Sequence, residues 1–184
     1  MTKVPITSED AQAVLNDAEL LYSAEDVEQA ITSMAKAITE KLSGSVPLVL
    51  PVMNGGLVLG GKLIPQLNFP LQMDYIHATR YRGETSGSEL SWLKKPESSL
   101  QDKIVLLIDD ILDQGITLAA IVDYCYEAGA KKVYTAVLAE KIIEQDKPIK
   151  HADFTGLKLP DRYVFGSGMD YHEYHRNLTG IYAV

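Results

Sequence analysis

The chain has 184 residues, with 17 Lys and Arg against 25 Asp and Glu and a formal net charge of -8. This length suits one globular domain over residues 1–184 rather than two, and the acidic balance argues against a protein that wraps nucleic acid or coats an anionic membrane. The single cysteine, Cys125, cannot form an intramolecular disulfide, no apolar stretch approaches a membrane span, and the N-terminus lacks a signal-peptide core, so we expect a cytoplasmic location.

The first third of the chain predicts two helices and then a strand, a turn and a third helix. Apolar residues recur at helical spacing over residues 8–21, and Ser23-Ala-Glu-Asp26 is typical of a capping box that begins a second helix. Residues 46–52 are almost all apolar and predict a short strand, residues 53–56 predict a tight turn, and residues 57–67 predict a helix that a proline ends early.

The next segment changes from strand-like to irregular. Residues 71–79 alternate imperfectly, as a strand does, whereas residues 80–102 lose all periodicity and begin with a polar, glycine-bearing stretch. An irregular insert of this length within a compact domain is more often a functional loop than a domain boundary. We therefore expect residues 79–102 to form a mobile lid loop.

The most informative segment reads Val-Leu-Leu-Ile-Asp-Asp-Ile-Leu-Asp-Gln-Gly-Ile-Thr from position 105 to 117. Its apolar start predicts a buried parallel strand, and a helical pattern begins around Thr117. Gly115 lets the backbone approach an anion, and the helix N-terminus favours negative charge. Phosphate is therefore the expected ligand. Asp109 and Asp110 would repel phosphate and are better suited to sugar hydroxyls or to Mg²⁺. A sugar phosphate would suit both the anion-binding turn and the two acids. The simpler alternative is a buried strand whose acids cap the next helix.

The remaining elements complete an alternating pattern. A glycine at position 129 is expected to end the helix, and residues 132–138 predict another strand. Strands alternating with helices predict an α/β fold with a mostly parallel twisted sheet, helices on both faces, and ligands at the carboxyl ends of the strands. The tail from Lys150 carries short strand candidates such as residues 162–165. We expect the tail and the N-terminal helices to form a small hood lobe over the site.

The segment from Asp109 to Thr117 resembles the signature with which type I phosphoribosyltransferases of purine salvage hold phosphoribosyl pyrophosphate. That signature is a hydrophobic strand, two acids, two aliphatic residues and then Asp-Thr-Gly-x-Thr. This chain departs from it at Gln114, where Thr is usual, and at Ile116, where a polar or small residue is frequent. Because such a loop binds phosphate mainly through backbone N–H groups, Gln114 should weaken or alter phosphate binding without abolishing it. The resemblance implies that Gln114, Gly115, Ile116 and Thr117 all contact the substrate.

The tail from Leu159 to Leu178 is similar to the C-terminal segment of hypoxanthine-guanine phosphoribosyltransferases. It has the same order of Pro-Asp, aromatic-Val, Gly and Asp-Tyr-x-Glu-Tyr-x-Arg. The resemblance implies that Tyr163 stacks on the purine and that the backbone of Val164 recognises its 2-position. It also implies that Asp170 lies near Mg²⁺, with Asp109 and Asp110, and that Arg176 binds pyrophosphate. These roles suit a flat aromatic face and a planar guanidinium.

The resemblance assigns roles to four further positions. The turn that holds Asn54 and Gly55 would contact pyrophosphate through its backbone, since Asn54 stands where the family often has Lys. Lys141 would donate to the 6-oxo group of the base, a match that the amino group of adenine cannot reproduce. Tyr81 in the lid would close over pyrophosphate. Asp113 is our candidate for the catalytic group that handles the proton on the imidazole nitrogen of the base.

These expectations describe a cytoplasmic purine salvage transferase that makes IMP or GMP and pyrophosphate with Mg²⁺ as cofactor. Its substrates are small molecules, neither nucleic acid nor membrane is an expected partner, and family habit suggests a homodimer or homotetramer. Three alternatives stay open at this point: a different base preference that includes xanthine, a nucleotide-sensing regulator that kept the fold, and a signalling receiver domain, whose opening strand also ends in two acids. A transition-metal site around His172 and His175 is a further alternative, and a surface helix is favoured there.

Overall fold

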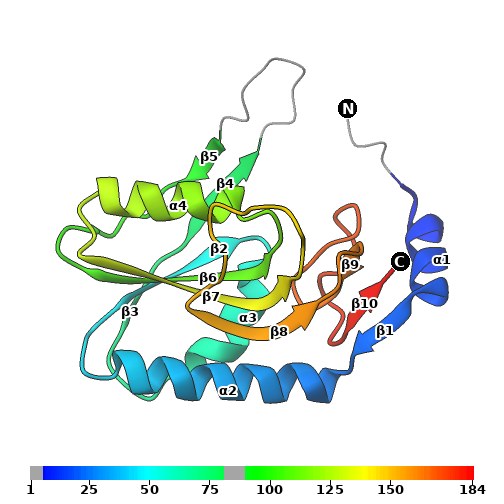
Figure 1. Ribbon diagram of the computed structural model, residues 1–184, viewed down its shortest axis with the longest axis horizontal. Coiled ribbons are helices and arrows are strands. Elements are labelled where there is room, and N and C mark those ends of the chain that lie inside the picture. The colour runs from blue at the N-terminus through cyan, green and yellow to red at the C-terminus, as the bar shows by residue number, and fades with distance from the viewer. Residues whose placement is uncertain (1–5, 81–89) are drawn as a thin grey trace.

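The protein is built on a seven-stranded sheet with helices on both faces (Figure 1). The computed structural model describes residues 6–80 and 90–184. The strands follow the order β5-β4-β2-β6-β7-β8, and β3 pairs with β2 beside this path. Their bounds are Leu48–Met53 for β2, Gln72–Met73 for β3, Ile76–Arg80 for β4, Leu90–Lys94 for β5, Ile104–Leu112 for β6, Lys132–Lys141 for β7 and Phe154–Leu159 for β8. All pairs are parallel except β4 with β5, which confirms the predicted α/β fold class.

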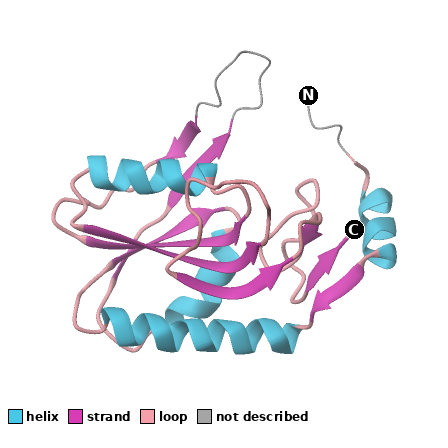
Figure 2. Ribbon diagram, viewed as in Figure 1, coloured by secondary structure: helices cyan, strands magenta, loops and turns pink. Residues whose placement is uncertain are grey.

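Two helices cover one face of the sheet and one covers the other (Figure 2). The helices α2 (Ala24–Leu42) and α3 (Gly56–Leu63) pack on one side, and α4 (Ile116–Glu127) packs on the opposite side. The predicted capping box begins α2: the Ser23 side chain accepts from Asp26 N, and the Asp26 carboxylate accepts from Ser23 N at 2.8 Å. A short 3₁₀ turn, Ile64–Gln66, extends α3 and contains the proline expected to end it. A separate apolar core fills each side of the sheet.

A three-stranded antiparallel sheet brings the two ends of the chain together. It consists of β1 (Glu19–Tyr22), β10 (Ile181–Ala183) and β9 (Val164–Phe165), in that order, with α1 (Ser8–Asp17) beside it (Figure 1). The prediction of one helix over residues 8–21 was wrong after Asp17. The sequence from position 19 forms a strand because β10, more than 150 residues later, offers it an edge to pair with.

The expected irregular segment over residues 80–102 was also wrong in part. Strand β5 lies within it and pairs with β4, so these two strands form a ribbon at the edge of the sheet. The Trp92 ring packs against Tyr124 of α4 with ring centroids 4.7 Å apart, and the Lys95 ammonium lies 4.8 Å from the centroid of the Tyr124 ring. This contact anchors the ribbon on α4. Residues 81–89, which include Tyr81, lie outside the described residues, and the mobile lid stays a prediction.

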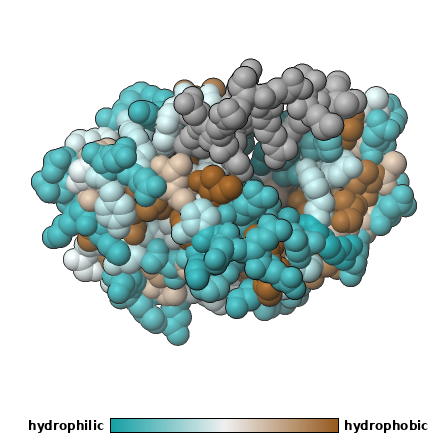
Figure 3. All heavy atoms as spheres, turned by 45° about the horizontal axis from the view of Figure 1, so that its top comes forward, coloured by the Kyte–Doolittle hydropathy of each residue, from teal (hydrophilic) through white to brown (hydrophobic). Residues whose placement is uncertain are grey.

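The surface of the protein is largely hydrophilic on the face that Figure 3 shows. On the face shown in Figure 3, hydrophilic side chains cover much of the surface and hydrophobic groups lie in small separate patches. Within residues 6–80 and 90–184, no helix is long and apolar enough to cross a membrane.

Candidate active site

A cavity lies between the carboxyl end of β6 and the start of α4, where the sequence predicts a phosphate site. A cavity of about 220 Å³ is lined by residues 111–118 together with Asp109. Gly115 precedes the helix in the left-handed conformation, with φ of 74°, and a Cβ there would lie 3.3 Å from the Ile149 carbonyl oxygen. A residue with a side chain would be strained at this turn. The glycine therefore lets the backbone N–H groups at the start of α4 face the cavity.

A second loop approaches the same strand from β2. It contains a cis peptide bond between Met53 and Asn54 and is followed by Gly55, the residue that precedes α3. A Cβ at Gly55 would lie only 2.0 Å from Asp110 Oδ2, so glycine allows the loop to pass directly over this carboxylate. The structure thus brings Asn54 and Gly55 next to the acids of β6, as the parallel pairing of β2 with β6 requires.

The C-terminal tail contributes Arg176, whose guanidinium lies between two carboxylates. Its Nη2 is 2.6 Å from Asp170 Oδ1, its Nη1 is 3.7 Å from Asp110 Oδ2, and Nη1 also donates to the Gly168 carbonyl at 2.7 Å. Arg176, predicted to bind pyrophosphate, therefore meets Asp110 and Asp170, both predicted to lie near Mg²⁺. Gly168 was missed by the sequence reasoning, because a backbone carbonyl contact leaves no signal in residue type.

The surroundings of the two acids of β6 disfavour their ionised forms. Burial raises the pKa of Asp109 well above its ordinary value, and the neighbouring charge of Asp110 raises it further. Burial also raises the pKa of Asp110, although hydrogen bonding with Asp109 and the Arg176 charge act in the opposite direction. Each carboxylate also accepts one hydrogen bond from the next backbone N–H, at 2.9 Å for Asp109 and 2.8 Å for Asp110. A bound polyol or cation would relieve the cost of ionising this pair.

The donor set fits a shared magnesium ion better than a protein-only metal site. Among the residues that the structure describes, no three His, Cys, Asp or Glu side chains converge on one point, so Asp109, Asp110 and Asp170 do not form a closed cage. Magnesium usually takes one or two carboxylates and completes its coordination with water and substrate phosphates. Hard carboxylate oxygens beside a phosphate cavity meet that requirement.

Asp113 and Lys141 meet at the ends of neighbouring strands. Lys141 Nζ lies 3.4 Å from Asp113 Oδ2, and the side chains are 12% and 46% exposed. Lys141 is the last residue of β7 rather than following it, and it pairs in register with Leu159, the last residue of β8. The chain then reaches Tyr163 and Val164 a few residues after β8. The residues predicted to contact the base therefore lie at the ends of β6 and β7 and shortly after the end of β8.

Tyr163 presents an exposed ring beside a firmly paired backbone. The residue is 47% exposed, and its ring lies edge-on to Tyr171 with ring centroids 5.2 Å apart. Its carbonyl accepts from Val184 N at 3.0 Å, and Val164 pairs with Ala183 of β10. The Tyr163 side chain is thus partly exposed, and the backbone at Tyr163 and Val164 is fixed by these pairings.

The predicted surface helix around His172 and His175 is wrong. Residues 170–176 form tight turns, and His172, Glu173 and His175 all have positive φ. His175 Nε2 lies 2.8 Å from the Ala11 carbonyl oxygen and its ring packs 5.2 Å from that of Phe165, so this histidine joins α1 to the tail. Among the described residues, neither histidine belongs to a group of His, Cys, Asp or Glu side chains that could hold a metal ion.

A mostly parallel sheet with a glycine turn after two adjacent acids is an arrangement suited to a sugar phosphate, and comparison with known proteins specifies the class of enzyme. The model of the phosphoribosyl transferase domain matches residues 17–173. A hypoxanthine-guanine phosphoribosyltransferase of Bacillus subtilis is 31% identical over 164 residues, 89% of this chain and 91% of that protein. A hypoxanthine-guanine-xanthine phosphoribosyltransferase of Tritrichomonas foetus is 28% identical over 91% of this chain and 92% of that protein. The crystal structure of a Staphylococcus aureus hypoxanthine phosphoribosyltransferase superposes with a TM-score of 0.86 at 28% identity, covering 94% of both chains.

The chain therefore belongs to the phosphoribosyltransferase family and is a transferase. This result confirms the type I phosphoribosyltransferase resemblance and excludes the signalling receiver domain.

Proposed function

We propose that the protein transfers the 5-phosphoribosyl group from phosphoribosyl pyrophosphate to hypoxanthine or guanine, giving IMP or GMP and pyrophosphate. The observation that carries this proposal is the juxtaposition of a cavity of about 220 Å³ with Asp109 and Asp110 of β6 and with the Asp113–Lys141 pair, which joins the end of β6 to the end of β7. The names of the relatives agree with a 6-oxopurine substrate.

In this proposal the ribose 5-phosphate lies in the cavity before α4. Backbone N–H groups of residues 114–117 and the Thr117 hydroxyl hold the phosphate, while Asp109 and Asp110 accept hydrogen bonds from the ribose hydroxyls. The diphosphate lies toward Asn54, Gly55 and Arg176. Bound Mg²⁺, near Asp109, Asp110 and Asp170, would neutralise charge on the departing diphosphate. Binding of the remote phosphate fixes the sugar carbon against the base.

The base lies between the tail and the ends of β6 and β7. Tyr163 stacks on the purine ring, the backbone of Val164 reads the 2-position, and Lys141 donates to the 6-oxo group. As the bond from the purine nitrogen to the anomeric carbon forms, the bond from that carbon to the diphosphate oxygen breaks, and Asp113 accepts the proton of the imidazole nitrogen. Tyr81 and the lid are expected to exclude water from the cationic, sugar-centred transition state.

A base preference extended to xanthine is the second candidate. It is favoured by the Tritrichomonas foetus relative, whose name includes xanthine. It is also compatible with recognition of the 2-position through backbone at Val164, because a backbone group can accommodate either an amino or an oxo substituent there.

We also propose that the protein works in the cytoplasm as a homodimer or homotetramer. A buried, unpaired Cys125 suits a reducing compartment. Large apolar side chains such as Leu57, Met73 and Leu93 are 55%, 63% and 62% exposed, and association between copies would cover such surface. Light scattering that gives the mass of a single chain at assay concentrations would contradict the oligomer.

An absorbance assay tests the function directly. Hypoxanthine, guanine, xanthine and adenine are each supplied with phosphoribosyl pyrophosphate and Mg²⁺, and a sample with ribose 5-phosphate in place of the diphosphate is the control. We expect turnover of hypoxanthine and guanine and none of adenine. Turnover of adenine alone would contradict the base assignment. No turnover of any base would favour a nucleotide-sensing regulator that kept the fold.

A further inference from the structure

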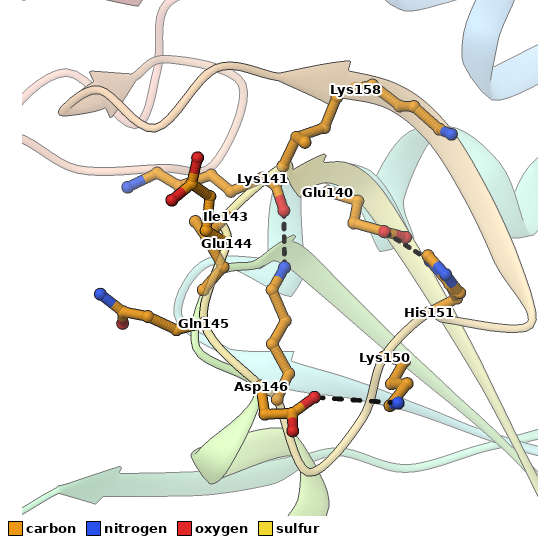
Figure 4. Close-up of a pocket in the computed structure, with 11 residues that line it drawn as sticks. Glu140, Lys141, Ile143, Glu144, Gln145, Asp146, Lys150, His151 and Lys158 are labelled. Atoms are coloured by element: carbon orange, nitrogen blue, oxygen red, sulfur yellow. Dashed lines mark hydrogen bonds and ion pairs between the residues drawn. The ribbon is translucent and has the colours of Figure 1, made fainter.

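Lys147, a residue outside the proposed catalytic and binding set, reaches the lysine proposed to select the base. The loop over residues 142–153 connects β7 to β8 and borders a cavity of about 320 Å³ (Figure 4). From this loop Lys147 Nζ donates to the backbone carbonyl of Lys141 at 2.6 Å, the dashed line that ends on Lys141 in Figure 4. The Lys147 side chain thus crosses the loop and ends on the last residue of β7.

This contact fixes the backbone from which the Lys141 side chain departs. On its C-terminal side Ile142 N donates to the Leu159 carbonyl at 2.9 Å, and Lys141 itself pairs in register with Leu159. The Lys141 side chain leaves this anchored point largely buried and reaches Asp113. A charged donor makes a stronger hydrogen bond to a carbonyl than a neutral one, so Lys147 resists rotation of this peptide group.

Four other charged or titratable residues around the cavity, Glu140, His151, Asp146 and Lys150, pair among themselves. Glu140 is buried, with Oε1 2.7 Å from His151 Nδ1 and Oε2 accepting from Thr155 at 3.2 Å. Lys150 is 77% exposed and lies 3.8 Å from Asp146, which is itself exposed (Figure 4). The same loop therefore carries two lysines of equal charge, one directed at the Lys141 backbone and one directed at an exposed carboxylate.

We propose that Lys147 is a positioning residue for purine selection, which holds the backbone of Lys141 so that its ammonium meets the 6-oxo group of the base. The inference rests on the proposed function, in which Lys141 is the donor to that group. Lys147 itself does not touch the substrate. Its loss is therefore expected to weaken binding of the base while leaving the phosphoribosyl pyrophosphate site intact.

The test is steady-state kinetics on four variants with each substrate varied in turn. Lys147→Met keeps the length and apolar stem and removes the donor; we expect the KM for hypoxanthine to rise about tenfold, with the KM for phosphoribosyl pyrophosphate and the Tm near those of the parent protein. Lys147→Arg keeps a charged donor and should restore most of the loss. Lys150→Met removes the same charge from the same loop and should change neither KM.

Two results would overturn the inference. The first is an unchanged KM for hypoxanthine in Lys147→Met; the second is an equal rise in both KM values with a lowered Tm, which would make Lys147 a merely structural residue. Lys141→Ala, the fourth variant, separates this failure from failure of the proposed function. If that variant loses base preference while Lys147→Met does not, only the inference falls. If Lys141→Ala leaves both base preference and KM unchanged, the purine role of Lys141 falls and the inference with it.

Discussion

The carboxylate of Asp113 and the ammonium of Lys141 lie 3.4 Å apart although 28 residues separate them in the sequence. Parallel pairing of β6 with β7 places the carboxyl ends of both strands at one edge of the sheet, and this pairing brings the two groups together. In a 6-oxopurine the oxo group and the adjacent imidazole nitrogen lie on the same edge of the ring. A donor and an acceptor at this separation can therefore address both atoms of that edge.

Asp113→Asn tests the acceptor. The amide keeps the shape of the side chain but cannot take the proton, so we expect kcat to fall about a hundredfold or more, with much smaller changes in both KM values. Asp123→Asn, a substitution on the next helix away from the strand ends, is the matched control. Unchanged turnover in steady-state kinetics would remove Asp113 from the role.

Lys141→Ala tests the donor. Without the ammonium, a 6-oxo group and a 6-amino group should be discriminated less well, so the ratio of kcat/KM for hypoxanthine to that for adenine should fall at least about tenfold. The measurement is competition between the two bases at limiting phosphoribosyl pyrophosphate. A variant that still strongly prefers 6-oxopurines would contradict the assignment.

Gly55→Ala tests the close approach of the second loop to β6. The added methyl would lie 2.0 Å from Asp110 Oδ2, so loop and carboxylate must separate, and we expect a loss of about 2 kcal/mol in the free energy of unfolding together with weaker phosphoribosyl pyrophosphate binding. Gly61→Ala, in the helix that follows, meets nothing within 4 Å and should leave stability equal or higher. Equal denaturant midpoints for the two variants would show that the contact is not tight.

Asp74→Asn tests the hydrogen bonds that hold the segment after β5. The Asp74 carboxylate accepts from the backbone N–H groups of Glu97 and Ser98 in this segment. Burial alone would raise the pKa of Asp74, but hydrogen bonds from the backbone N–H groups of Ser98, Tyr75 and Glu97 outweigh it and lower the pKa. A lowered folded-state pKa means stability that is present above the unfolded value and lost as pH falls through the folded value. The unfolding free energy of the parent should exceed that of the variant by about 1 kcal/mol at pH 7, and this difference should shrink below about pH 4. If the difference stays constant down to pH 3, these hydrogen bonds do not favour the ionised carboxylate.

The segment from 105 to 117 allowed both the fold class and the centre of the site to be predicted, because its strand, acids and glycine turn are set by local sequence. The edge strands β1 and β5 could not be predicted. Leu20 is 51% exposed and Trp92 packs on a helix residue more than 30 positions away, so neither strand shows a regular alternation. Their structure depends on partners distant in the chain.

The tail shows the same division between local pattern and tertiary context. The order of residues from 159 to 178 predicts which side chains contact the substrate, but the spacing of His172 and His175 wrongly favoured a helix. Both residues adopt positive φ in turns that are held by contacts to α1 and to Arg176. The hydrogen bond from Lys147 to the Lys141 carbonyl likewise depends on the path of a loop, and the residue types alone do not predict it.

A crystal structure with bound IMP is the most direct test of the proposed substrate site. We expect the 5-phosphate against the backbone N–H groups of residues 114–117, the ribose hydroxyls on Asp109 and Asp110, and the 6-oxo group within hydrogen-bonding distance of Lys141 Nζ. A nucleotide bound with its phosphate elsewhere, and the cavity before α4 free of it, would show that this site is not where the enzyme holds its substrate.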